Sequence, residues 1–148
     1  MPKIVVGVDG YDASRNALIW AFEEARLRGA ELVAVHAWEP PPTIPEPGPA
    51  PGFDLVAVLP QVEEAGKRLV ETVTKEAAGD YADVTYEGVA LNGPPVEVLV
   101  DAARDADILV VGSRGRGGFA ALVLGSVSQA LAHHAPSPLL IYRRAASG

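Results

Sequence analysis

The sequence predicts an α/β fold, a doubly wound five-stranded parallel sheet with helices on both faces. Short runs rich in valine and isoleucine alternate with longer segments that have helical periodicity, as expected for strands connected by helices. The apolar runs lack polar alternation, which is typical of strands covered on both faces. With 148 residues, 49% of them hydrophobic, the chain is predicted to form one domain over residues 1–148.

The first half of the chain contains two predicted strands around one helix. Residues 3–9 form the first strand, and residues 31–38 form the second. The helix between them is predicted to be capped by Asp12 or Ser14 and to end near residue 28, before Gly29. Its core-facing residues have helical spacing: Ala17, Leu18, Ala21, Phe22 and Ala25.

Residues 39–55 form a proline-rich loop in this prediction. Proline occupies seven positions between 40 and 51, and such a segment can neither pair in a sheet nor continue a helix. We favour a surface insertion. Its length is the one observation that points instead to a lid over a ligand.

The second half continues the alternation. A helix is predicted from Pro60 or Gln61 to residue 78, with Ala65 among its core-facing residues. The remaining expected elements are strand 84–90, helix 96–104, strand 108–111, a helix from Gly125 or Ser126 to residue 133, and strand 138–142.

Glycines follow the fourth predicted strand in a pattern suited to phosphate binding. Gly112 and Gly115 lie in a loop, and Gly125 with Ser126 opens the next helix. Glycines allow the backbone to approach a ligand closely, and free N–H groups in loops and at helix N-termini bind anions. Ser126 could alternatively cap the helix. Arg114 and Arg116 lie within the loop and are either phosphate ligands or solvated side chains.

Further candidates lie where parallel strands end, which is where ligands bind in such sheets. Asp9 could bind ribose hydroxyls or a metal ion, or could cap the following turn. Ala37 would offer its backbone N–H and C=O to an adenine edge, and Gly7 and Val8 would line the same wall. His36, alone in an apolar strand, is expected to be a hydrogen-bonded core histidine rather than a ligand.

The spacing Gly112-x2-Gly115-x9-Gly125-Ser126 resembles the G-2x-G-9x-G-[S/T] motif of ATP-binding universal stress proteins. The resemblance extends over nearly the whole chain, through VVGVDG at residues 5–10, VAVHA at 33–37 and PLLI at 138–141. It implies a Rossmann-like fold of the adenine nucleotide alpha hydrolase type, a homodimer through residues 138–142, and ATP with Mg²⁺ as ligand. The residues implied to surround ribose and phosphates are Val111, Gly112, Gly115, Gly125, Ser126, Val127 and Ser128.

Composition limits the other function classes. A net charge of −7 disfavours binding to nucleic acid or to an anionic membrane. The absence of cysteine excludes thiolate catalysis and cysteine zinc sites, and no apolar run approaches about 18 residues, so a soluble cytoplasmic protein is expected. Residues 115–120 match a dinucleotide fingerprint, but no acidic residue follows position 134, which argues against NAD.

These observations favour a nucleotide-dependent regulatory module of the stress response. Two alternatives remain at this level: a slow ATPase, and a binder of AMP or cyclic AMP rather than ATP. The glycine pattern carries no lysine of the Walker type, so hydrolysis is expected to be weak at most and no catalytic residue is assigned.

Overall fold

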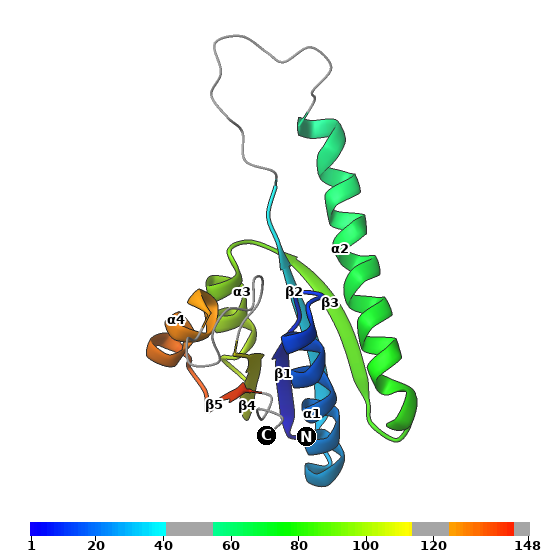
Figure 1. Cartoon of the computed structure of the whole chain (residues 1–148), viewed down its shortest axis with the longest axis vertical. Helices are drawn as coiled ribbons and strands as arrows, with labels where there is room; N and C mark the ends of the chain where they lie inside the picture. The colour runs from blue at the N-terminus through cyan, green and yellow to red at the C-terminus, as the bar shows by residue number, and fades with distance from the viewer. Residues whose placement is uncertain (41–54, 114–124, 144–148) are drawn as a thin grey trace, which may run out of the picture.

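A computed structural model describes residues 1–40, 55–113 and 125–143, and the predictions for the proline-rich loop and for Arg114, Gly115 and Arg116 lie outside these residues. The described residues form an alternating series of strands and helices (Figure 1). The elements are β1 (Lys3–Gly7), α1 (Asp12–Arg28), β2 (Glu31–Trp38), α2 (Leu55–Ala77), the 3-10 turn η1 (Ala78–Asp80), β3 (Tyr86–Asn92), α3 (Pro95–Ala102), β4 (Ile108–Gly112), α4 (Ser126–His134) and β5 (Leu139–Tyr142).

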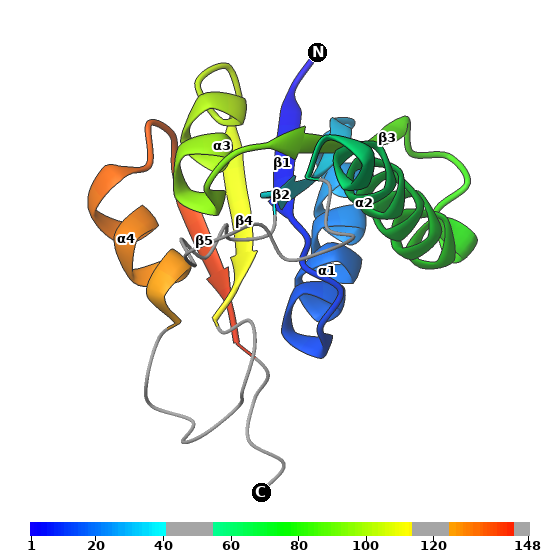
Figure 2. The ribbon, with the colours of Figure 1, turned by 90° about the horizontal axis from the view of Figure 1, so that it is seen from above.

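The five strands form one parallel sheet in the order β3-β2-β1-β4-β5, which confirms the predicted doubly wound architecture. The chain starts in the middle of the sheet, adds β2 and β3 on one side, and then returns to add β4 and β5 on the other. Helices α1 and α2 cover one face, and α3 and α4 cover the other (Figure 2).

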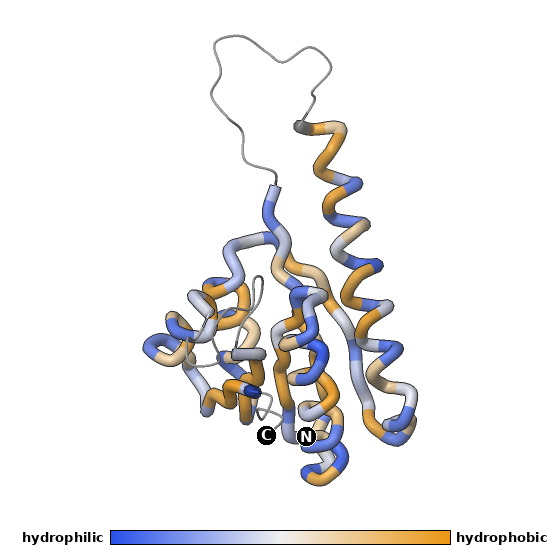
Figure 3. The backbone as a smooth tube through the Cα atoms, viewed as in Figure 1, coloured by the Kyte–Doolittle hydropathy of each residue, from blue (hydrophilic) through white to orange (hydrophobic). Residues whose placement is uncertain are grey.

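The core has two layers because successive residues of a strand point to opposite faces. On β1, Ile4 and Val6 pack towards α1 and α2, whereas Val5 packs towards α3 and α4. Apolar residues accordingly concentrate on the central strands, while polar and apolar residues alternate along α2 (Figure 3). The predicted apolar face of α1 is confirmed, and Gly29 adopts the left-handed conformation that ends the helix, with φ of 62°.

Several local predictions are wrong. The first strand ends at Gly7 rather than at residue 9, and α3 ends at Ala102 rather than at residue 104. Neither Asp12 nor Ser14 caps α1; Tyr11 occupies that position, and the Ser14 hydroxyl bonds to Asp9 instead. Helix α2 begins at Leu55 and continues through Pro60, which lies inside the helix rather than at its start and removes one i→i−4 hydrogen bond there.

Two further errors concern the contact face of α2 and the start of the third strand. Ala65 of α2 is exposed while Gly66 is buried, so the contact face of the helix is rotated from the predicted one. The third strand runs two residues later than predicted. The buried Val84 belongs to the preceding turn, in which the Val84 N–H donates to the Tyr81 carbonyl. Within the described ranges, no helix is long and apolar enough to cross a bilayer.

Two leucines of α1 provide a matched test of this packing. Leu18 is fully buried, whereas Leu27 is 76% exposed. We predict that Leu18→Ala lowers the free energy of unfolding by about 2–5 kcal/mol, since it leaves a cavity in the core. The same change at Leu27 should stay within about 0.5 kcal/mol of the wild type. Urea unfolding measures both, and equal losses would contradict the assigned face of α1.

Candidate functional site

The order of the strands reverses between β1 and β4, and the candidate site lies at the carboxyl ends of these two strands. In doubly wound sheets, ligands bind at such a reversal because the connections leave in opposite directions. The described candidate residues lie near this edge: Gly7, Val8 and Asp9 at the end of β1, Ala37 in β2, Val111 and Gly112 at the end of β4, and Gly125, Ser126, Val127 and Ser128 at the start of α4.

Asp9 closes the turn between β1 and α1. Its Oδ1 accepts hydrogen bonds from the Tyr11 N–H at 2.9 Å and from the Ser14 hydroxyl at 2.7 Å. The Ser14 oxygen in turn accepts from the Asp9 N–H at 3.1 Å. The turn-capping role is therefore present. Oδ2 has no hydrogen-bond partner among the described residues, which leaves one carboxylate oxygen for a ribose hydroxyl or a cation.

Ala37 directs its backbone groups towards the side of β2 on which β1 lies. Alternate residues of a strand bond to opposite neighbours. The Leu32 N–H donates to the Thr85 carbonyl and the Trp38 carbonyl accepts from the Gly93 N–H, so the even-numbered residues of β2 face β3. Ala37, with the odd-numbered residues, faces β1.

The β1–β2 ladder stops before it reaches Ala37. The last paired residues are Gly7 and Val35, and one more bond joins the Val8 N–H to the Val35 carbonyl at 2.8 Å. The Val8 carbonyl accepts from Nδ1 of His36 at 2.8 Å, which makes His36 the hydrogen-bonded histidine that we expected. No hydrogen bond joins the Ala37 N–H to any described residue.

Gly112 allows β4 and α1 to approach each other directly. A Cβ atom at this position would lie 2.8 Å from the Ala13 carbonyl carbon and oxygen, closer than real Cβ atoms come to backbone. The glycine is therefore required by packing within the fold, whatever its contact with a ligand.

The start of α4 is attached to the same strand end. The Ser128 hydroxyl donates to the Gly112 carbonyl at 2.6 Å, and the Gly125 N–H donates to the Ser113 carbonyl at 2.7 Å. The Ser113 N–H donates to the Tyr142 carbonyl of β5 at 2.8 Å. Ser128 is buried with its proton committed, so it positions α4 rather than offering that O–H to a ligand.

The first turn of α4 has backbone donors that bond to no described residue. Gly125 is the N-cap and has no side chain, and the first bond into the helix is from the Gln129 N–H to the Gly125 carbonyl at 2.9 Å. The N–H groups of Ser126, Val127 and Ser128 precede it and have no partner within the helix. Together with the positive end of the helix dipole, they form an environment that favours anions.

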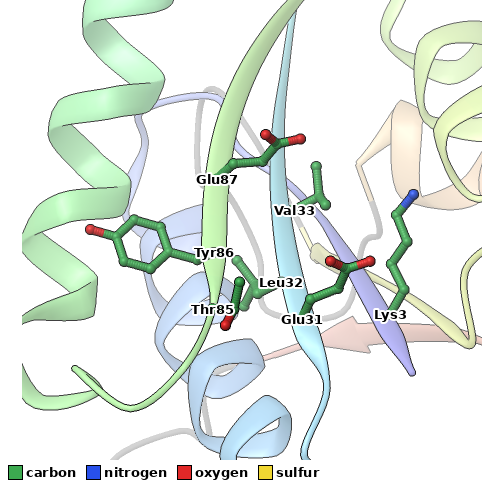
Figure 4. A pocket seen from close by; sticks show the side chains of 7 residues that line it. All are labelled: Lys3, Glu31, Leu32, Val33, Thr85, Tyr86 and Glu87. Atoms are coloured by element: carbon green, nitrogen blue, oxygen red, sulfur yellow. The ribbon is translucent and has the colours of Figure 1, made fainter. Parts of the chain in front are cut away.

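A shallow pocket of about 180 Å³ lies at the opposite, amino-terminal edge of β1, β2 and β3 (Figure 4). It is remote from the sequence-predicted site. Two acidic side chains, Glu31 and Glu87, line it and disfavour phosphate, and the Lys3 ammonium is already paired with Asp105 at 3.1 Å. Over the described ranges, no cluster of three or more histidine, aspartate or glutamate side chains could hold a metal ion by itself.

Sequence reasoning did not assign the contacts by which three residues build the site edge. Ser14 orients Asp9, Ser113 connects α4 with β5, and His36 binds the Val8 carbonyl. The hydroxyl residues near Asp9 and after Gly112 were visible signals, although helix capping explained Ser14 equally well. Nothing in the sequence indicated which carbonyl His36 would bind.

Comparison with known proteins shows the family of the chain. A family model described as the universal stress protein family matches residues 1–143. The chain belongs to the universal stress protein family. It is 37% identical over 142 residues to a universal stress protein of Mycobacterium tuberculosis, a match that covers 95% of this chain and 45% of the relative. The chain thus spans about half the length of the curated relatives it matches.

Solved universal stress proteins share the fold. One, crystallised in complex with cAMP, is 27% identical with a TM-score of 0.68 and covers 96% of each chain. Another, from Lactobacillus plantarum, is 22% identical with a TM-score of 0.77, and covers 96% of this chain and 97% of its own. At 22% identity, the similarity to the Lactobacillus plantarum protein concerns the fold alone.

The close contact at Gly112 gives a testable consequence. We predict that Gly112→Ala lowers the free energy of unfolding by about 1–3 kcal/mol, since Ala13 backbone must move. Gly79→Ala is the control because a Cβ atom there meets nothing within 4 Å. Thermal unfolding of both variants measures the difference, and a Gly112 variant as stable as the Gly79 variant would refute the contact.

Proposed function

We propose that this universal stress protein binds an adenine nucleotide at the carboxyl ends of β1 and β4. The observation that carries the proposal is the backbone N–H of Ala37, which bonds to no described residue and lies at the same sheet edge as the N–H groups at the start of α4. The relative that was crystallised with cAMP supports this ligand class, since it is 27% identical over nearly the whole chain.

The base is proposed to bind beside β2. The Ala37 N–H would donate to a ring nitrogen of adenine, and its C=O would accept from the exocyclic amino group. Gly7 and Val8 at the end of β1 and Val111 on β4 are proposed to line the walls around the nucleoside. Backbone recognition of this kind needs no particular side chain at position 37.

The phosphates are proposed to bind at the start of α4. Free N–H groups after Gly125 and the exposed hydroxyl of Ser126 would donate to phosphate oxygens. The glycine motif adds Gly112, Gly115 and Arg114 to the proposed site. Gly115 and Arg114 lie outside the described residues. Val127 and Ser128 would contribute backbone donors.

The resemblance of this spacing to the motif of ATP-binding universal stress proteins favours ATP with Mg²⁺ as the ligand. One oxygen of Asp9 and the phosphates would hold the ion, because Mg²⁺ in proteins often binds one carboxylate together with phosphates and water. AMP and cyclic AMP share the base and ribose contacts, so calorimetric titration with all three, with and without Mg²⁺, tests this choice. Tighter binding of AMP or cyclic AMP than of ATP would overturn it.

We propose regulation by nucleotide occupancy in the stress response, with hydrolysis of ATP weak at most. Oδ1 of Asp9 already accepts two hydrogen bonds within its turn, which suits a fixed ligand contact better than the role of a base. We also propose a cytoplasmic location, and the net charge of −7 disfavours nucleic acid and anionic membranes as partners. A hydrolysis rate well above background that Asp9→Ala abolishes would contradict a pure binding role.

A charge at the start of α4 tests the phosphate site. We predict that Gly125→Asp keeps the fold, because aspartate is a favourable N-cap, but weakens ATP binding about fivefold to thirtyfold through repulsion. Adenosine, which has no phosphate, should bind as it does to the wild type. Gly125→Ser is the uncharged control. Equal ATP affinity of the Asp and Ser variants in calorimetry would place the phosphates elsewhere.

A homodimer through β5 is the second part of the proposal. β5 is an edge strand whose apolar residues are all half-buried. The Leu109 N–H donates to the Pro138 carbonyl and the Ser113 N–H to the Tyr142 carbonyl, so the backbone groups of Ile141 point away from β4. Such an open edge pairs readily with a second copy across a two-fold axis.

Proline at this edge tests the dimer. We predict that Ile141→Pro shifts the protein to monomer in sedimentation, since proline removes an outward N–H without removing a β4 bond. Ile141→Ala shortens the side chain but keeps the N–H, and should remain a dimer. A dimeric proline variant with native circular dichroism would exclude this edge as the interface.

A further inference from the structure

We infer that His36 makes the site selective for adenine by keeping the Ala37 N–H free. This inference rests on the proposed nucleotide site and adds a positioning residue to it. His36 needs no contact with the base for this role. It acts through the carbonyl of Val8.

The first step concerns the bond that a regular ladder would form. In a parallel pair, the carbonyl of a residue on one strand accepts from the N–H of the residue that follows its partner on the other. Gly7 is opposite Val35, so Val8 is opposite His36 and its carbonyl would accept from the Ala37 N–H. In the structure this carbonyl accepts from Nδ1 of His36 at 2.8 Å, and it accepts no hydrogen bond from the Ala37 N–H.

The second step concerns the burial of Val8, which is 4% exposed. A buried carbonyl without a donor is costly, so it bonds to whichever donor is within reach. With His36 present, that donor is the imidazole. Without it, the Ala37 N–H is the donor that the ladder places nearest, and β1 and β2 would pair for one residue more.

The third step concerns how the imidazole is held. A carbonyl can only accept, so Nδ1 carries the proton in this contact. Helix α2 passes close to the ring at Gly66, where a Cβ atom would lie 3.4 Å from Cδ2 of His36 and 3.5 Å from Trp38. The ring thus lies between the strand and the helix.

The chemical consequence is a choice between bases. Adenine presents an acceptor at N1 and a donor at its 6-amino group, whereas hypoxanthine presents a donor at N1 and an acceptor at position 6. A free Ala37 N–H matches the adenine pattern. Once this N–H is consumed by Val8, N1 of adenine loses its partner and the distinction weakens.

The test compares AMP with IMP, the hypoxanthine nucleotide, by calorimetry. We expect His36→Leu to lower the ratio of AMP to IMP affinity about threefold to tenfold, the equivalent of one neutral hydrogen bond. His36→Asn should restore the ratio, because its amide nitrogen can donate to the Val8 carbonyl. The control is His133→Leu, which removes an exposed histidine at the far end of α4. A folded His36→Leu variant with the wild-type ratio would overturn the inference.

Amide hydrogen exchange of the ligand-free protein tests the same point without nucleotide. The Ala37 amide should exchange much faster than the Val35 amide in the wild type and in His36→Asn, and should become protected in His36→Leu. A wild-type Ala37 amide as protected as that of Val35 would refute the role of His36, even if the leucine variant does not fold. Fast exchange without AMP binding would refute the proposed function instead, and with it the selectivity for adenine.

Discussion

Strands β1 and β2 stop exchanging backbone hydrogen bonds at Val8, and the polar groups beyond that point need other partners. The Val8 carbonyl accepts a hydrogen bond from the imidazole of His36, whereas the N–H of Ala37 faces the end of β1, the shorter strand. Buried backbone groups are nearly always paired, so an unpaired one at a sheet edge where ligands bind is informative. The proposed recognition of adenine depends on this difference in length between two strands, rather than on any side chain that reaches the base.

A second contact brings the start of α4, the proposed phosphate site, to the same edge. Gly112 permits β4 to touch the start of α1, and Ser128 fastens α4 to the Gly112 carbonyl at 2.6 Å. Because these attachments lie within the fold, the free donors after Gly125 hold their position before any ligand arrives. Such preorganisation lowers the entropic cost of binding. Small residues in the motif therefore let three elements meet, and in the proposed site they would also let the backbone approach a ligand.

The sequence was sufficient for the architecture because apolar runs, helical periodicity and Gly29 all agree locally with the final fold. It was less informative where two signals compete. Ser14 could cap a helix or bind Asp9, and the buried Val84 could belong to a strand or to a turn. The partner of His36 depends on a register between distant strands, which no local pattern encodes. Candidate residues could be named from spacing, but the difference between Ser128, which holds the helix, and Ser126, which is exposed, required coordinates.

The most direct measurement of the central claim is the amide NMR spectrum of the protein during titration with AMP. The account predicts a large shift of the Ala37 amide signal as it gains a hydrogen-bond acceptor, with smaller shifts at the first residues of α4 as they meet the phosphate. The Val35 amide, which already lies within the β1–β2 ladder, should change little. Saturation with the nucleotide while the Ala37 signal stays in place would show that adenine binds elsewhere, and would contradict the account.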